Sequence, residues 1–259
     1  MSKISRLNET KINKFGSEIK IIKYNNSNDI DVYFPKYNWV SRNRQYTDFK
    51  TGKIQCPYEP RFYGVGYVGE GKYTFKTHRC IYDKWTSMIE RCYNKKYQEK
   101  RPTYIGCAVC SEWHNFQNFA KWYEENYYEI EGEKMCLDKD ILVKGNKIYS
   151  PETCIFVPQR INELFVKNNA IRGKYPIGIS YHKTKEKLIV RCNVFDDNSI
   201  SYTKSKQIGI FQINQIEEAF KLYKQYKEKT IKQMADKYKL YIPQKLYDAM
   251  YRYEVEIND

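Results

Sequence analysis

Apolar and polar residues alternate in two short runs near the start of the chain, and this alternation predicts β-strands. Residues 18–24 and 30–34 show the pattern, and the polar stretch at 25–28 between them predicts a turn. The glycines at 64–71 neither open an evident helix nor lie in a βαβ frame, so they do not form a dinucleotide-binding loop. We expect residues 1–75 to form a small antiparallel barrel or sheet without a catalytic signature.

The periodicity changes to helical spacing after residue 76. Apolar residues recur three or four positions apart in two stretches, the second of which begins near Ser111 or Asn115. The two stripes consist of Ile81, Trp85, Met88 and Cys92, and of Trp113, Phe116, Phe119, Trp122 and Tyr123. Such stripes far more often pack into a protein core than line a cofactor, so we interpret them as core.

A strand–turn–strand–helix order follows a break at Gly132. Residues 135–142 and 148–158 have the composition of strands, residues 144–146 are typical of a turn, and a helix begins before Asn162. We therefore predict a ββα unit within residues 76–170.

Three more strands and a helix are predicted over residues 171–240. The strands fall at 177–182, 187–194 and 208–211, with a turn at 196–198, and the helix at 214–235. Strand alternation turns Leu188, Val190 and Cys192 toward this helix. The opposite face then carries Lys187, Ile189, Arg191 and Asn193.

Together these patterns predict an α+β protein of several domains. An N-terminal β module covers 1–75, a central helical part with the ββα unit covers 76–170, and a three-stranded sheet with a helix covers 171–240. The last part, 241–259, is a tail in which Pro243 precedes apolar residues typical of a short helix.

The charge balance points to a polyanionic partner. The chain has 45 Lys and Arg against 31 Asp and Glu, a net charge of +14, and it has 26 Tyr, whose rings stack and whose hydroxyls reach phosphate. A basic surface that only keeps the protein in solution, and AT-rich codon usage that inflates Lys and Tyr, are the alternatives. No apolar run approaches membrane-spanning length and no secretory signal is evident, so we expect a cytoplasmic protein with reduced cysteines.

The predicted three-stranded sheet is the clearest candidate for binding DNA. Residues 171–210 contain eight Lys or Arg against three Asp or Glu. A sheet face with Lys, Arg and Asn can enter the major groove, where Arg binds guanine and Asn binds adenine in bidentate fashion. The alternative is an ordinary solvated sheet face.

This segment resembles the AP2/ERF family of DNA-binding domains, a three-stranded sheet packed on one helix whose sheet reads the major groove. The resemblance covers about residues 173–235 and rests on Gly178-Ile-Ser-Tyr, Lys187-Leu-Ile-Val-Arg-Cys, Ile208-Gly-Ile-Phe and Glu217-Glu-Ala-Phe-Lys-Leu-Tyr. It implies contacts to double-stranded DNA from Tyr181, Lys183, Lys187, Arg191, Asn193 and the 204–207 strand with Lys204 and Gln207. Plant members carry Arg and Trp where this chain has Lys, Ile and Asn, so target specificity does not transfer.

The middle segment is similar to a phage family with an HNH-like nuclease core, which often precedes an AP2-like domain in the same order as here. The two resemblances together cover about residues 80–235. This one rests on Trp85-x2-Met88-x2-Arg91-Cys-Tyr, Tyr104-Ile-Gly-Cys-Ala-Val-Cys-Ser-Glu-Trp113, Phe116-x2-Phe119-x2-Trp122, Leu137-Asp-Lys-Asp140 and Tyr149-Ser-Pro-Glu-Thr-Cys154.

The resemblance implies a catalytic and metal site for Mg²⁺ or Mn²⁺. HNH enzymes use a first-strand His as general base, a neighbouring Asp and a helix His or Asn as metal ligands, and a middle Asn that orients the base. Asp138 and Asp140 occupy the first-strand region, Thr153 the middle position, and Asn162 the helix ligand position. Two carboxylates and an amide oxygen can hold a hard cation, although no His is present.

Two interpretations of this core stay open: an active site, or a degenerate core that only binds DNA or packs. His78 and His114 are not placed at this site by any pattern. Cys107 and Cys110 form half of a zinc motif, but none of Cys92, Cys136, Cys154 and His114 completes it at standard spacing, so we expect reduced thiols rather than zinc.

The leading hypothesis is a sequence-specific DNA-binding protein related to phage HNH homing endonucleases, with metal-dependent cleavage if the core is active. The alternatives are a non-catalytic phage regulator that uses the same sheet, and a factor that binds a host protein.

Overall fold

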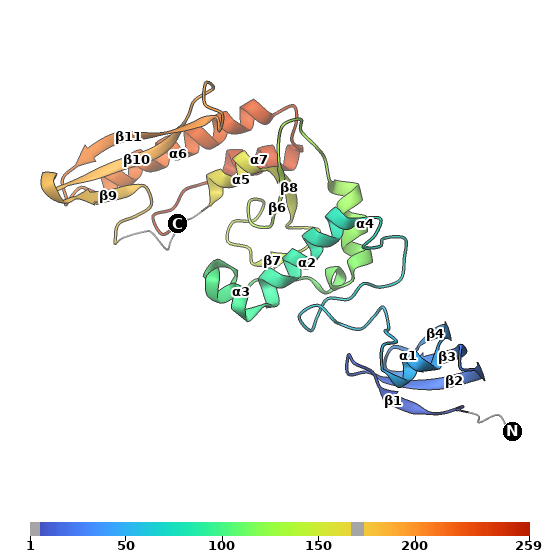
Figure 1. The fold of residues 1–259 in the computed structure, drawn as a ribbon. Helices are drawn as coiled ribbons and strands as arrows, with labels where there is room; N and C mark the ends of the chain where they lie inside the picture. The colour runs from blue at the N-terminus through green and yellow to red at the C-terminus, as the bar shows by residue number, and fades with distance from the viewer. Residues whose placement is uncertain (1–5, 167–173) are drawn as a thin grey trace. The chain divides into compact units, whose positions relative to one another are not determined.

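The computed structural model describes residues 6–166 and 174–259, and the described chain divides into two compact units (Figure 1). One unit contains the residues up to 125 together with 147–151, and the other contains 126–146 and the residues from 152 onward. The mixture of helices and antiparallel sheets confirms the predicted α+β class. The four-segment division predicted from the sequence stays a prediction. Along the described chain, no helix combines the length and apolar character needed to cross a bilayer.

The N-terminal part of the first unit is a four-stranded antiparallel sheet in the order β1-β2-β3-β4, which confirms the predicted sheet. The alternating residues of β2 and β3 bury one face, where Ile21, Val32 and Phe34 pack around Phe49 of a short helix. The strands are β1 (Thr10–Ile12), β2 (Glu18–Asn26), β3 (Asp29–Phe34) and β4 (Trp39–Arg44), a turn of 3₁₀ helix covers Pro35–Tyr37, and the helix is α1 (Tyr46–Lys50).

Helices with aromatic stripes form the rest of the first unit. Trp85 and Trp113 are fully buried, and the Trp85 indole N–H donates to the Trp113 carbonyl at 2.8 Å. Both predicted stripes are therefore core, as expected. The elements are α2 (Arg79–Tyr93), α3 (Lys95–Lys100), β5 (Ala108–Val109), α4 (Phe116–Asn126), β7 (Ile148–Tyr149) and 3₁₀ turns at Pro102–Tyr104 and Ser111–His114.

A ββα unit opens the second unit, but its strands are shorter than the pattern predicts. β6 (Met135–Asp138) pairs antiparallel with β8 (Ile155–Pro158), and α5 (Gln159–Phe165) packs against them. The first strand ends at Asp138 because the Asp138 carboxylate accepts the backbone N–H groups of the next turn. The expected strand at 148–158 is interrupted, because β7 pairs in parallel with β5 of the first unit instead.

The C-terminal sheet has the order β11-β10-β9 and is antiparallel throughout. Its strands are β9 (Ile179–His182), β10 (Lys187–Phe195) and β11 (Thr203–Phe211), with a 3₁₀ turn at Lys183–Lys185. Leu188, Val190 and Cys192 are buried against the long helix α6 (Ile216–Tyr238), as the alternation predicts. Gly178 precedes β9 with φ +77°, and a Cβ there would lie 2.1 Å from the Tyr223 ring, so only glycine lets this ring close the core.

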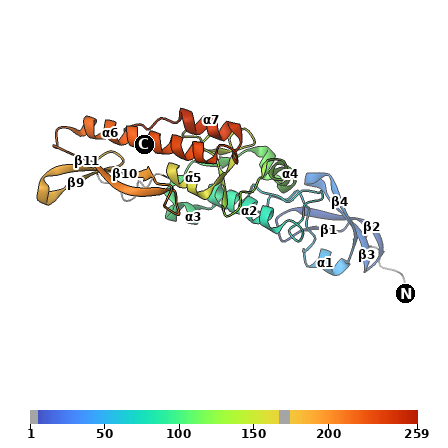
Figure 2. The same ribbon diagram turned by 90° about the horizontal axis from the view of Figure 1, so that it is seen from above.

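One helix, α6, belongs to two cores of the second unit. Its first half packs against the sheet through Ala219 and Tyr223. Its second half packs through Ile231 and Met234 against the ββα unit and α7 (Gln244–Arg252), the predicted closing helix. Figure 2 shows α6 running along the sheet and then alongside α7.

Candidate nucleic-acid interface and carboxylate site

The face of the C-terminal sheet opposite α6 brings together four of the residues predicted to contact DNA. Strand register pairs Arg191 with Gln207, and Lys187 with His182, and alternation along β10 puts Asn193 on this same face. Arg191, Asn193 and Gln207 are exposed, whereas Lys187 is half-buried. We call this surface, with Lys187, Arg191, Asn193 and Gln207, the open face.

A β-bulge moves other predicted residues off the open face. The register of β10 and β11 shifts between Val190 and Arg191, so Lys204 lies opposite Val194, on the side of the sheet that faces α6. An unbroken register would instead have turned Lys204 and Lys206 onto the open face. Both lysines remain exposed because β11 is an edge strand.

Tyr181 and Lys183 also lie away from the open face. Tyr181 pairs with Leu188, whose side chain faces α6, and its ring stacks on Tyr175 with centroids 6.3 Å apart. Lys183 is exposed in the 3₁₀ turn between β9 and β10. Ile189, which the alternation predicts to be exposed, is only 4% exposed although Arg191, the next residue on the same side of the strand, is exposed. Arg172, part of the predicted basic charge, lies outside the described residues.

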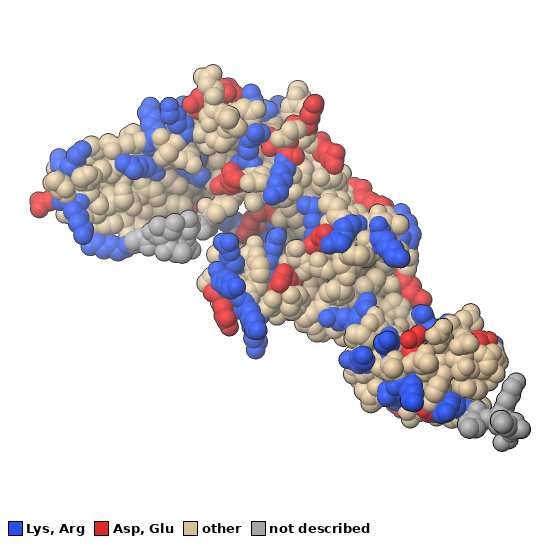
Figure 3. Space-filling view, in the orientation of Figure 1, with Lys and Arg blue, Asp and Glu red and all other residues tan. Residues whose placement is uncertain are grey.

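The charge of the three strands is of one sign. β9, β10 and β11 contain four Lys or Arg and no Asp or Glu. Within the described part of the chain, none of Lys187, Arg191, Lys204 and Lys206 forms an ion pair. On the face shown in Figure 3, Lys and Arg side chains are spread around the region of this sheet. Cations without acidic partners leave their charge available to an anionic ligand.

The second candidate site is a carboxylate at the end of β6. Asp138 Oδ1 accepts the backbone N–H groups of Asp140 at 2.8 Å and Ile141 at 2.7 Å. Burial and the neighbouring Asp140 carboxylate raise the pKa of Asp138 to about 6, and the two backbone N–H groups oppose this shift without cancelling it. A desolvated carboxylate beside a second one is a place where a cation would be stabilised.

The loop after Asp138 is tied by a reciprocal pair of hydrogen bonds. Lys139 Nζ donates to the Asn146 carbonyl at 3.1 Å, and Asn146 Nδ2 donates to the Lys139 carbonyl at 2.6 Å. The same ammonium pairs with Asp140 Oδ2 at 3.1 Å. Asn146 thus holds the loop that carries both carboxylates. Thr153, the residue expected at the middle position, lies in the turn before β8, and its role stays a prediction.

Asn162 is not brought to the carboxylates by any hydrogen bond among the described residues. It lies half-buried on α5, which packs on β6 and β8 through Ile161 and Leu164. Its assignment as a ligand stays a prediction.

The half zinc motif lies in the first unit. Cys107 is buried and Cys110 is half-buried. His114 Nε2 lies 3.1 Å from the Val109 carbonyl oxygen. In residues 6–166 and 174–259, no three His, Cys, Asp or Glu side chains gather into a ligand cluster of the kind that holds a structural zinc ion.

Comparison of the chain with protein-family models, with curated proteins and with solved structures finds no match.

Proposed function

We propose that this protein binds double-stranded DNA and that the open face of the β9–β11 sheet enters the major groove. The proposal rests on one observation: three strands with four cations and no carboxylate present Arg191, Asn193 and Gln207 together on one exposed surface. Arg pairs with guanine, and Asn or Gln with adenine, through two hydrogen bonds each. The exposed edge lysines of β11 are suited to phosphates beside the groove.

The test is a fluorescence-anisotropy titration of the whole protein with a labelled duplex of mixed sequence over a series of salt concentrations. We expect binding that weakens steeply with salt, because each phosphate contact releases counterions. The double variant Arg191→Gln, Asn193→Ala should bind more weakly than the wild type. Absence of duplex binding, or affinity that does not change with salt, would overturn the proposal and favour a host-protein partner.

A second function, metal-dependent DNA cleavage, is favoured by the Asp138–Asp140 pair. The donor chemistry fits Mg²⁺ or Mn²⁺: two adjacent oxygen ligands, one of them desolvated and destabilised by the other. Asp138 and Asp140 would hold the cation, which when bound stabilises negative charge on the phosphate.

Neighbouring backbone and side-chain groups hold the two carboxylates in position. Two backbone N–H groups fix Asp138 Oδ1. Lys139 orients Asp140 and is itself held by Asn146. The HNH-like assignment, with a site built without His, rests on the sequence resemblance and on the β6–β8–α5 arrangement.

Plasmid nicking with and without Mg²⁺ or Mn²⁺ tests the second function. Asp138→Asn keeps an oxygen for the two backbone N–H groups but removes the charge, so it should abolish nicking and leave duplex binding intact. Asp236→Asn, a change of equal charge on α6, is the matched control and should nick normally. If the wild type binds DNA in a salt-sensitive way but does not nick it, the DNA-binding proposal stands and the cleavage proposal is rejected. The protein would then be a non-catalytic regulator.

A further inference from the structure

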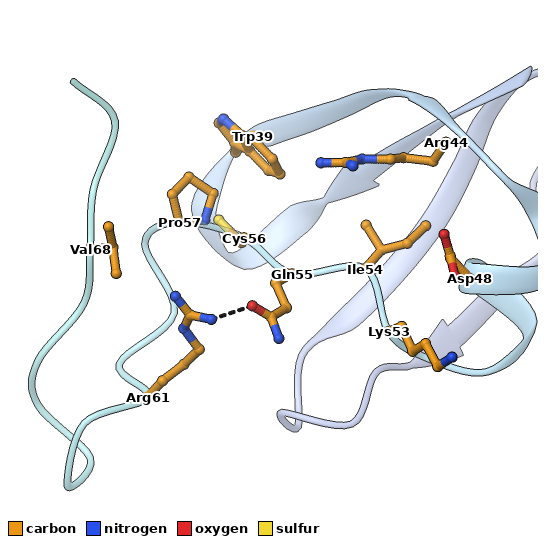
Figure 4. A pocket seen from close by; sticks show the side chains of 10 residues that line it. All are labelled: Trp39, Arg44, Asp48, Lys53, Ile54, Gln55, Cys56, Pro57, Arg61 and Val68. Carbon is orange, nitrogen blue, oxygen red and sulfur yellow. Dashed lines mark hydrogen bonds between the residues drawn. The ribbon is translucent and has the colours of Figure 1, made fainter. Parts of the chain in front are cut away.

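A cavity of about 490 Å³ lies beside the N-terminal sheet, in a region to which the sequence assigned no site (Figure 4). Its walls come from the end of the sheet and from the loop that follows α1. The lining residues are Trp39, Arg44, Asp48, Lys53, Ile54, Gln55, Cys56, Pro57, Arg61 and Val68. This volume is in the range of sites that enclose a small organic ligand.

An aromatic ring forms one wall of the cavity. Trp39 opens β4 and packs its inner side on the buried ring of Phe34, with centroids 5.5 Å apart and an interplanar angle of 56°. The rest of the indole is accessible and borders the cavity, whereas Trp85, Trp113 and Trp122 are buried. A large ring held by the core on one side can offer its other side to a planar ligand at little entropic cost.

Three cations border the same space. Arg44 is positioned by its Nε–H, which donates to Ser41 Oγ at 2.7 Å, and Arg61 donates to Gln55 Oε1. Lys53 is the third, and Figure 4 shows the guanidinium of Arg44 extending toward the indole. In the described chain, none of these three forms an ion pair with a carboxylate, and Asp48 is the one acidic residue among the lining side chains.

The indole and the three cations that line the cavity limit the chemical class of ligand that it can bind. An apolar ligand would bury guanidinium groups without giving them acceptors, which is costly. An acidic peptide would satisfy the cations and leave the indole without a planar partner. A nucleotide has both parts, a base that stacks on an aromatic ring and a phosphate that accepts from Arg in bidentate fashion.

We infer that this cavity binds one nucleotide unit, with the base on Trp39 and the phosphate between Arg44 and Arg61. The inference goes beyond the proposed function, because the site belongs to the first unit and does not bind the groove of a DNA duplex. Its ligand is a nucleotide, either as part of an unpaired strand or free.

The experiment is a titration of tryptophan fluorescence in the whole protein with short oligothymidylate. Because the other three indoles are buried, stacking should quench the Trp39 emission selectively. Thymidine monophosphate, inorganic phosphate and polyglutamate are titrated in parallel. If the oligomer quenches at a lower concentration than the monophosphate, the ligand is an unpaired strand. If the two are equally potent, the ligand is a free nucleotide. Both results support a site that stacks a base and binds its phosphate.

Variants locate the signal. Trp39→Phe should abolish the quench, and Arg44→Gln and Arg61→Gln should each weaken binding about fivefold, in line with loss of a charge-assisted hydrogen bond. Lys23→Gln, an exposed cation of β2 outside the cavity, is the control and should bind as wild type. Circular dichroism confirms that each variant is folded.

The outcomes separate this inference from duplex binding. Arg191→Gln should leave the Trp39 quench unchanged even where it weakens duplex binding. No quench with any nucleotide, a quench insensitive to both arginine variants, or equal competition by polyglutamate would overturn the inference; the last result would identify an acidic protein segment as the ligand.

Discussion

Each of the two larger antiparallel sheets packs a helix against one face, yet the sheets use their charged residues differently. In β1–β4, the buried Asp31 accepts the Asn43 backbone N–H at 3.1 Å and pairs with Arg42 at 3.6 Å. The strands β9–β11 have no acidic residue to do this. Charge in the first sheet partly stabilises the sheet itself, whereas the cations of β9–β11 have no acidic residue beside them on these strands.

The sheets also differ in where their candidate ligand-binding side chains lie. In the second sheet these side chains lie on the strands themselves, where alternation and a bulge decide which of them are neighbours. The first presents them at a cavity completed by a loop, where Trp39 and Arg61 come from segments far apart in sequence. This contrast predicts that duplex binding and nucleotide stacking respond to different substitutions.

The largest expected effect is on the free energy of unfolding, when a buried side chain in the core of either sheet is truncated. Leu188→Ala and Ile21→Ala each remove a fully buried side chain and should lower the free energy of unfolding by about 2–5 kcal/mol. Urea denaturation measures the loss. We expect Leu188→Ala to impair duplex binding and spare the Trp39 quench, and Ile21→Ala to do the reverse. Loss of both activities in both variants would break the comparison.

The next effect is on recognition by the open face. Arg191→Gln should weaken binding to a preferred duplex by about 1–3 kcal/mol, because a bidentate pair to a base is lost. Competition anisotropy with preferred and random duplexes measures the loss, which should be smaller for the random sequence. Arg42→Gln, in the first sheet, is the matched control, and an equal loss there would contradict the assignment.

A smaller effect is expected at the sheet edge. Lys206 faces the α6 side because of the bulge, so Lys206→Gln should not alter sequence preference. It should lower the slope of log affinity against log salt by about 0.9 if it contacts one phosphate. A change in sequence preference would show that Lys206 reaches the groove and that the bulge does not separate the two faces.

The smallest effect concerns Lys227 of α6, whose pKa is lowered by burial. Its charged form is disfavoured in the folded state, so this penalty is present at neutral pH and is relieved as pH rises from the folded-state pKa toward that of the unfolded chain. Lys227→Met should therefore raise the free energy of unfolding at pH 7, with a smaller gain near pH 10. Parallel urea denaturation of both proteins measures it, and a gain that does not depend on pH would point to packing alone.

Periodicity predicted most of the fold because burial imposes it directly. The stripe that contains Trp85 and the alternation of Leu188, Val190 and Cys192 are where the pattern placed them. The bulge could not be predicted, because residues 204–207 are all polar and apolar residues occur at 208, 210 and 211, so either register buries a similar set. The bulge therefore removes Lys204 from the predicted set, in addition to Tyr181 and Lys183, which lie away from the open face for other reasons.

Asp138 and Asp140 stay predicted site residues, but the local structure around them was not predicted. Local side-chain hydrogen bonds end β6, and a parallel pairing with β5 takes Ile148 and Tyr149 out of the expected strand. Neither competing interaction leaves a periodic signal. The cavity at Trp39 was not predicted at all, since it depends on how the segment from Lys53 to Val68 folds back.

The double membership of α6 has a thermodynamic consequence. A ligand that binds only the folded sheet adds a free energy of RT ln(1 + [L]/Kd) to the folded state, about 2.7 kcal/mol at a hundred times Kd. The same continuous helix packs on the ββα unit, and its Tyr238 hydroxyl donates to the buried Glu133 just before β6. That free energy would therefore also oppose any opening of the β6–β8 strand pair that unfolds α6. DNA bound to the β9–β11 sheet would thus slow amide hydrogen exchange in the Asp138 turn through α6, even without a direct contact to that turn.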